Sequence, residues 1–279
     1  MIRNLFNFFL FSSLFIALGA VLMVHQTNQL LQLRYNFTPL LYFVLFSTLC
    51  SYNVHWYFTP VSSSEKTRSH WTQKHRYIHL VLAIAGAFVS AWFFFSFGNK
   101  WIWIGPAILL TSLYTAPKLP FVVFRYLKKV AIGKTIYLSA VWMYVTTALP
   151  LLISDKSWNG ADVLFCIGRF FFIYAICILF DYRDREQDKK EGIRSLITYF
   201  SEKGINRLFV SSFLVFVIST TLLLLYNISI PVIITLLIPG LLTALLFQEA
   251  KRNDSDYLYY FILDGLMMFS SLLTLFMPF

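Results

Sequence analysis

At 279 residues, the chain is too apolar to fold as a soluble globular domain. Hydrophobic residues make up 58% of it and charged residues only 13%, about half the charged share of an ordinary soluble domain. Its formal net charge of +10 needs no nucleic-acid partner, because membrane topology and contact with anionic lipid account for it.

Nine apolar stretches follow one another along the chain, most of them long enough to cross the hydrocarbon core of a bilayer as a helix. None alternates with the period of two that barrel strands require. We therefore predict an all-α polytopic membrane protein, a bundle of about nine transmembrane helices. The stretches lie at 9–30, 39–58, 79–97, 101–115 (short for a full span), 131–153, 161–180, 208–226, 230–248 and 258–278.

Lysine and arginine are very unevenly divided between the loops. The loops that follow the even-numbered stretches hold eighteen of them, and those that follow the odd-numbered stretches hold three. Because positively charged loops stay in the cytoplasm, the amino terminus is predicted inside and the carboxyl terminus outside. No cleavable signal peptide is evident. We expect an integral protein of a bacterial inner (plasma) membrane, with its active side facing the cytoplasm.

No loop is long enough for an independent soluble domain, so residues 1–279 are interpreted as a single transmembrane domain. Polar clusters at 52–56 and 181–184 end the second and sixth stretches at the same predicted face. The similarity of these two clusters suggests two half-bundles, roughly 1–130 and 131–279, around one cytoplasmic cavity. Internal repeats in secondary transporters produce the same pattern.

Three aspartates follow the sixth stretch at helical spacing. If that helix continues, Asp181, Asp184 and Asp188 lie within about 60° of one another on a single stripe. Like charges so placed repel unless a cation lies between them, and Mg²⁺ binds through one or two carboxylates and substrate phosphates. The alternative is a solvated helix end, with the acids neutralised pairwise by Arg183, Arg185, Lys189 and Lys190.

A second cluster lies where the fourth stretch reaches the same face. Tyr114 and Lys118 are close to the end of that stretch, and Arg194 follows the aspartates. Ammonium and guanidinium groups are the usual partners of phosphate, so these residues are candidates for binding a phosphorylated substrate. The alternative for Lys118 is a topological anchor, with Tyr114 in the interfacial aromatic belt.

These residues carry a family resemblance. Asp181-x-x-Asp184-x-x-x-Asp188, followed by Gly-Ile-Arg-Ser-Leu at 192–196, resembles the second aspartate-rich motif of UbiA-type intramembrane prenyltransferases. Tyr114-x-x-x-Lys118 resembles the Tyr-x-x-x-Lys motif of that family. The resemblance implies nine helices, with aspartates that hold Mg²⁺ on an isoprenyl diphosphate. It also implies transfer of the isoprenyl group to an aromatic or other lipophilic acceptor, with Asp181, Asp184 and Asp188 as catalytic, metal-binding residues.

The family's first aspartate motif is missing. Its positions fall on Asn53, Val54, Tyr57 and Val61, so its three aspartates are absent. Asn53 could still offer an oxygen to a substrate, but it lacks the negative charge that a second Mg²⁺ favours. Either one metal site suffices, or the substrate is not the usual diphosphate, or catalysis has been lost while the cavity remains.

Placing an ionisable side chain within the membrane costs free energy, so each such residue is a candidate for a functional role. We interpret Arg169 and Asp264 as a structural ion pair between the sixth and ninth helices. The aromatic runs 92–95 and 170–172 could line a tunnel for an isoprenoid tail, although such runs more often face lipid.

The sequence thus predicts a UbiA-like, Mg²⁺-dependent prenyltransferase that acts on an isoprenyl diphosphate and a lipophilic acceptor. Its partners are expected to be these substrates and membrane lipid, with no nucleic acid and no protein partner. Two alternatives stay open: a catalytically inactive isoprenoid- or lipid-binding member of the same fold, and a secondary transporter. Few Gly or Pro residues interrupt the stretches, which argues modestly against a transporter.

Overall fold

A computed structural model describes residues 2–59, 67–116, 133–190, 192–193 and 195–277. Within these ranges every regular element is a helix, which confirms the all-α prediction. The first elements are α1 (Ile2–Phe11), α2 (Leu14–Leu30), α3 (Thr38–Tyr57), α4 (Thr67–Lys74), α5 (Arg76–Phe94), the 3₁₀ helix η1 (Phe95–Lys100) and α6 (Trp101–Thr115). Next come α8 (Lys134–Met143), the π-helix η4 (Tyr144–Ala148), α9 (Leu149–Ile153), α10 (Gly160–Lys190) and α11 (Leu196–Tyr199). The last are α12 (Glu202–Leu222), the 3₁₀ helix η5 (Leu223–Tyr226), α13 (Ile230–Arg252), the π-helix η6 (Leu258–Leu263) and α14 (Asp264–Thr274).

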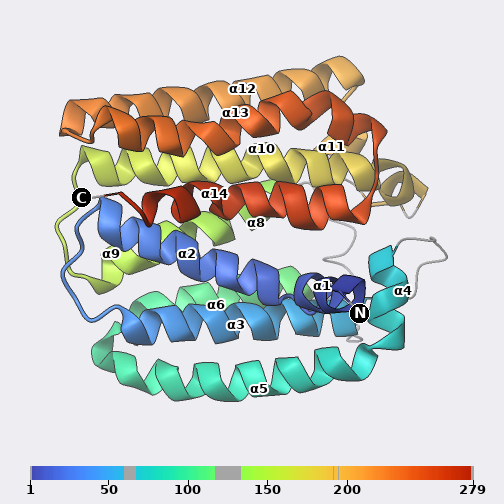
Figure 1. Ribbon diagram of the computed structural model, residues 1–279, viewed down its shortest axis with the longest axis horizontal. Helices are drawn as coiled ribbons and strands as arrows, with labels where there is room; N and C mark the ends of the chain where they lie inside the picture. The colour runs from blue at the N-terminus through green and yellow to red at the C-terminus, as the bar shows by residue number, and fades with distance from the viewer. Residues whose placement is uncertain (1, 60–66, 117–132, 191, 194, 278–279) are drawn as a thin grey trace.

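The long helices run side by side along the longest axis of the molecule, and the two termini lie at opposite ends of the bundle (Figure 1). The end that carries the amino terminus also carries α4, α11 and the final turns of α10, where many of the basic residues lie. This arrangement agrees with the predicted separation of charged loops. Which side of a membrane each end faces stays a prediction.

By length and composition, five helical segments are apolar and long enough to cross a membrane, and the bent pair α1 and α2 would make a sixth. One of the five, Arg76–Thr115, joins α5 and α6, yet Gly98 has φ 54° within it and the chain turns back there (Figure 1). The helices therefore coincide with the nine predicted stretches, while the number that cross the bilayer stays a prediction.

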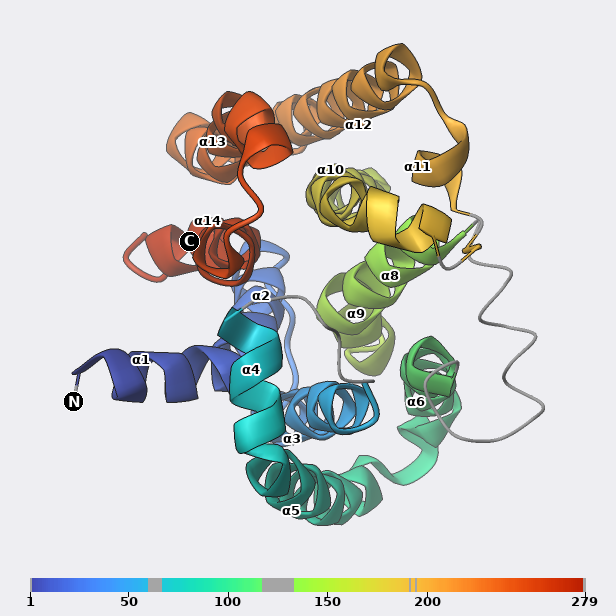
Figure 2. The same cartoon turned by 90° about the vertical axis from the view of Figure 1, so that its right-hand side faces the viewer.

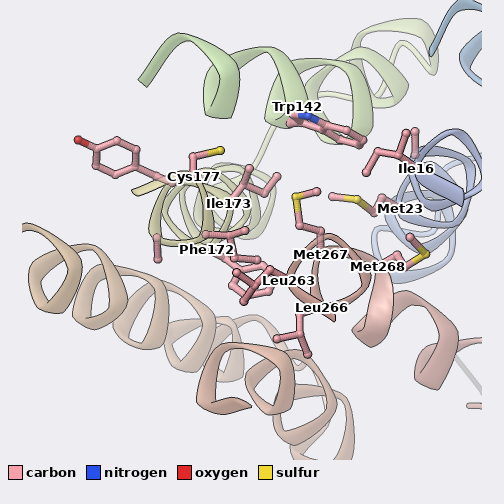
Figure 3. Close-up of a cluster of buried hydrophobic side chains, with 14 of the residues drawn as sticks. Ile16, Met23, Trp142, Phe172, Ile173, Cys177, Leu263, Leu266, Met267 and Met268 are labelled. Atoms are coloured by element: carbon pink, nitrogen blue, oxygen red, sulfur yellow. The ribbon is translucent and has the colours of Figure 1, made fainter. Parts of the chain in front are cut away.

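The bundle core lies where α2, α8, α10 and α14 meet (Figure 3). Trp142, Ile173, Met23 and Met267 are among its buried side chains. Because lipid is as apolar as these side chains, close van der Waals packing rather than escape from water holds such helices together. Gly86 shows how close that packing is: a Cβ atom there would lie 2.7 Å from the carbonyl oxygen of Phe46, so α3 and α5 need a glycine at this contact.

The helix α10 is longer than predicted. It extends from Gly160 to Lys190, ten residues past the expected end at residue 180. The three aspartates therefore lie on one continuous helix, as their stripe geometry requires. Seen from the end that carries α4 and α11, α10 lies next to α8, with α6 beyond it (Figure 2).

Candidate active site

The aspartate stripe of α10 faces partly into the protein. Asp181 and Asp188 are buried, whereas the side chain of Asp184 is 38% exposed. The solvated helix end that we considered as the alternative would leave all three in bulk water. Two of the four cations proposed to neutralise the stripe pair with glutamates instead: Arg185 with Glu202 at 2.7 Å and Lys189 with Glu186 at 2.8 Å.

Asp181 is held by the first two residues of α8. The hydroxyl of Thr135 donates a hydrogen bond to Oδ2 of Asp181, and Nζ of Lys134 lies 3.8 Å from Oδ1. Helix α8 begins here with Gly133 as its N-cap residue, whose carbonyl accepts from the N–H of Tyr137. The amino-terminal, positive end of the α8 dipole therefore lies close to a carboxylate, a favourable arrangement of charge.

Asp184 is positioned through Arg183. The Nε of Arg183 lies 3.1 Å from Oδ1 of Asp184. The same guanidinium donates to the hydroxyl of Tyr260 at 2.9 Å and lies 3.7 Å from Asp256. Because Arg183 is nearly buried and has planar, directional donors, it fixes this end of α10 against η6.

Tyr114 forms the facing wall. It lies in the last turn of α6, and its ring stacks on that of His55 with centroids 5.3 Å apart. Tyr114 is within electrostatic range of Lys134 and Asp181. The structure therefore places Tyr114 near Asp181. The other two predicted phosphate-binding residues, Lys118 and Arg194, lie outside the described residues.

Asn53 has a different place. It is fully buried, and its amide nitrogen donates to the carbonyls of Ser12 at 3.0 Å and Leu49 at 2.8 Å. Its amide oxygen lies 2.7 Å from Nδ1 of His79. These contacts tie the 58° bend between α1 and α2 to α3 and α5. We expected Asn53 among the substrate-binding residues, but the structure directs its polar atoms into the fold.

The end of α3, where the first aspartate motif would lie, is aromatic. The guanidinium of Arg68, from α4, is 3.9 Å from the ring of Trp56 and 4.0 Å from that of Tyr260. Burial lowers the pKa of Arg68, and the nearby Tyr260, Asp264 and Asp256 act in the opposite direction. Sequence reasoning counted Arg68 only as a topological charge. The position of Arg68 in the sequence, close to the end of a predicted span, does not indicate that its guanidinium lies between the rings of Trp56 and Tyr260.

An apolar cavity of about 510 Å³ lies between α3, α5, α6 and α8. Phe43, Phe94, Leu138 and Trp142 are among its walls. Tyr114, in the last turn of α6, also lines it, so the cavity extends toward the aspartates. Of the aromatic runs that we considered as tunnel walls, Phe94 and Phe95 line this cavity. Trp92 is 71% exposed, as expected of a residue that faces lipid, and Phe172 is buried against Phe216.

The predicted ion pair between Arg169 and Asp264 does not form. Arg169 donates to Oε1 of Gln26 at 2.8 Å, and Gln26 is in turn bonded to Ser271 and Thr274. Asp264 lies within electrostatic range of Tyr52 and Arg68, near the end that carries α4. The two residues are at different depths of the bundle, so they cannot meet.

The described residues do not form a complete metal site by themselves. Among them, no group of three or more His, Cys, Asp and Glu side chains is arranged to hold a metal ion. A buried carboxylate such as Asp181 nevertheless fits the way Mg²⁺ is usually held, by one or two carboxylates and the oxygens of substrate phosphates. The donor set is thus suited to a metal that arrives with a phosphorylated substrate.

A model of the UbiA prenyltransferase family matches residues 72–272. No curated protein and no solved structure gives a significant match. The matched region includes Tyr114, Lys134 and the whole aspartate stripe, and it begins after the end of α3. This intramembrane helical bundle therefore belongs to the UbiA prenyltransferase family, as the two motifs predicted.

Proposed function

We propose that the protein is a membrane prenyltransferase that transfers an isoprenyl group from an isoprenyl diphosphate to an aromatic or other lipophilic acceptor. One observation carries this proposal. The buried Asp181, with Lys134 and Tyr114 near it, lies close to an apolar cavity of about 510 Å³ that Tyr114 also lines. An isoprenyl diphosphate has the same division, since a highly charged head is attached to an apolar tail.

Each residue of the proposed site has a role that follows from its position. Asp181, Asp184 and Asp188 would hold Mg²⁺, which supplies positive charge to the departing diphosphate. Thr135 orients the carboxylate of Asp181 and Arg183 that of Asp184. We expect Lys118 and Arg194 to contact the phosphates as well.

The aromatic wall is suited to the other product of bond cleavage. When the C–O bond to the diphosphate breaks, positive charge develops on the first carbon of the isoprenyl group. The faces of Tyr114 and Trp142, which line the cavity, can stabilise such charge through their ring quadrupoles. The same apolar walls exclude water, which would otherwise capture the carbocation. We propose that this chemistry takes place at the cytoplasmic face of a bacterial plasma membrane.

A second candidate is an isoprenoid- or lipid-binding protein without transferase activity. The described end of α3, residues 51–59, contains no aspartate or glutamate, so one wall of the site has no carboxylate for a metal. If a single metal site is too weak to support bond cleavage, the cavity would still bind an isoprenoid.

The test uses the purified protein in lipid nanodiscs and a radiolabelled isoprenyl diphosphate, with Mg²⁺ or with EDTA. We expect Mg²⁺-dependent binding, and transfer of label to a lipophilic acceptor from a membrane extract. Asp181→Asn should weaken the Mg²⁺-dependent binding by about 100-fold, the order expected when a charge-assisted ligand is lost. Glu186→Gln, an exposed carboxylate of the same helix, is the control and should behave as the wild type.

The outcomes separate the two candidates. Binding without transfer to any acceptor would favour the lipid-binding candidate. A wild-type protein that binds no isoprenyl diphosphate under either condition would exclude both uses of the diphosphate site.

A further inference from the structure

We propose that Lys134 binds the diphosphate of the substrate directly, so that a fixed ammonium group shares with the metal the task of neutralising it. This inference rests on the proposed function and adds to it a residue outside both sequence motifs. On sequence grounds, Lys134 was counted only among the charges that set the topology.

Within the described residues, the donors of Lys134 make no hydrogen bond. Its Nζ lies 3.8 Å from Oδ1 of Asp181, which is too long for a hydrogen bond. The other carboxylate oxygen of Asp181 accepts from Thr135 instead. Among the described residues, no atom accepts a hydrogen bond from this ammonium group, although lysine has three donors. The side chain is 38% accessible, so a ligand can reach it.

The charges around Lys134 belong to the proposed substrate site. Lys134 is within electrostatic range of Asp181, Tyr114, Asp188 and Asp184. Three carboxylates and a diphosphate carry charge of the same sign and repel one another, and one Mg²⁺ ion offsets only part of that charge. The described end of α3 offers no carboxylate for another metal ion, so a fixed cation at Lys134 would help to balance the charge of the site.

The position of Lys134 in its helix supports the same conclusion. It is the first residue of α8, where the helix dipole disfavours a cation and favours an anion. For a lysine that served only as a topological anchor, this position would offer no favourable interaction with the helix dipole. With a diphosphate bound, both the ammonium and the amino-terminal end of α8 act on the same anion.

A salt bridge that serves the fold alone is the competing explanation. Such a pair would be expected to close to hydrogen-bonding distance, about 2.8 Å for an ammonium and a carboxylate. Asp162 shows this in the same protein, since its Oδ1 lies 2.6 Å from Nζ of Lys156. At 3.8 Å, the ammonium of Lys134 does not form this direct hydrogen bond with Asp181.

The experiment measures binding of radiolabelled inorganic diphosphate and of an isoprenyl diphosphate to nanodisc-embedded protein, in Mg²⁺ and in EDTA. Lys134→Gln should weaken binding of both probes at least about tenfold, in EDTA as well as in Mg²⁺, because a charge-assisted hydrogen bond is lost. Lys134→Arg should recover most of the affinity. Lys203→Gln, which removes an exposed lysine of α12, is the matched control and should bind as the wild type does.

A second measurement needs no substitution. The wild-type protein is acetylated with a water-soluble reagent, and the labelled lysines are identified by mass spectrometry. Diphosphate should protect Lys134 from acetylation and leave Lys203 unprotected. This reading stays valid even if Lys134→Gln does not fold.

Three results would overturn the inference. One is diphosphate binding by a folded Lys134→Gln protein that equals wild-type binding. Another is an absence of protection in the wild type. The third is a Lys134→Gln variant whose affinity for Mg²⁺ rises while its affinity for metal-free diphosphate is unchanged, which would make Lys134 a counter-ion of Asp181. In all three cases Mg²⁺-dependent binding by the wild type would leave the proposed function standing, whereas loss of all wild-type binding would remove both.

Discussion

The carboxyl-terminal ends of α3 and α10 are the two polar ends that the sequence suggested as equivalent halves of one site. The structure shows that they differ in what their polar groups contact. At the end of α10, Asp181 and Lys134 lie beside each other without a direct hydrogen bond. At the end of α3, Asn53 is fully buried and bonded to three other residues.

The difference concerns charge as well as contact. The α10 end carries four carboxylates, the three aspartates of the stripe and Glu186, whereas residues 51–59, at the end of α3, carry none. Around α3, the cation of Arg68 is enclosed by Trp56 and Tyr260. A polar group whose hydrogen bonds are satisfied within the fold stabilises the fold. A polar group with unused donors in an accessible place is available to a ligand. On this criterion, we assign the proposed site to the end of α10 with Lys134 of the adjoining α8, and a structural role to the end of α3.

The largest expected effect follows from the structural role of the α3 end. Replacement Asn53→Ala removes three contacts of a fully buried amide and leaves the carbonyl of Ser12 and the ring of His79 without that partner. We expect a loss of about 3 kcal/mol in unfolding free energy, measured by denaturant titration in detergent. Affinity for isoprenyl diphosphate should change less than about twofold in the folded protein.

Asn4→Ala is the matched control, because Asn4 is an exposed amide on α1 and should leave stability within about 0.5 kcal/mol of the wild type. If Asn53→Ala kept full stability and lost substrate affinity, the two ends would have exchanged the roles assigned to them here.

Asp184→Asn tests the α10 end. Asp184 is partly exposed and paired with Arg183, so its removal should change stability little. Its carboxylate is part of the proposed Mg²⁺ site, and we expect Mg²⁺-dependent binding of isoprenyl diphosphate to fall about tenfold. Isothermal calorimetry in Mg²⁺ and in EDTA measures this. An unaffected affinity in Mg²⁺ would show that the metal is held elsewhere.

Much of the helical layout could be predicted from the sequence. Apolar length sets where a helix can cross lipid, and the nine predicted stretches coincide with helices. It does not set where a helix ends. Helix α10 continues ten residues beyond its apolar stretch, because charged residues are compatible with a helix once it has left the hydrocarbon. That extension is what places the aspartates on one stripe.

Pairing across the bundle could not be predicted in the same way. The partner of Asp181 is Thr135, 46 positions away, and no periodicity within one helix reports such a contact. The only local sign of this contact in the sequence was Lys134, because the start of a helix is an unfavourable place for a cation. The incorrect pairing of Arg169 with Asp264 came from treating both as groups within the membrane. Counting about 1.5 Å per residue from the end of each predicted stretch would have separated their depths.

The smallest expected effect concerns the positioning of Asp181 by Thr135. Replacing Thr135→Val keeps the shape of the side chain and removes the hydroxyl that donates to Asp181. Asp181 then keeps its charge and the nearby ammonium of Lys134, but it loses the hydrogen bond that orients its carboxylate. We expect binding of isoprenyl diphosphate in Mg²⁺ to weaken about threefold to tenfold, the range for one hydrogen bond to a charged group. Thr135→Ser, which keeps the hydroxyl, should bind within about twofold of the wild type. A loss in Thr135→Ser with none in Thr135→Val would mean that packing of the methyl group on Cβ, rather than the hydrogen bond, positions the carboxylate, and the role of Thr135 at this end of α10 would then be steric.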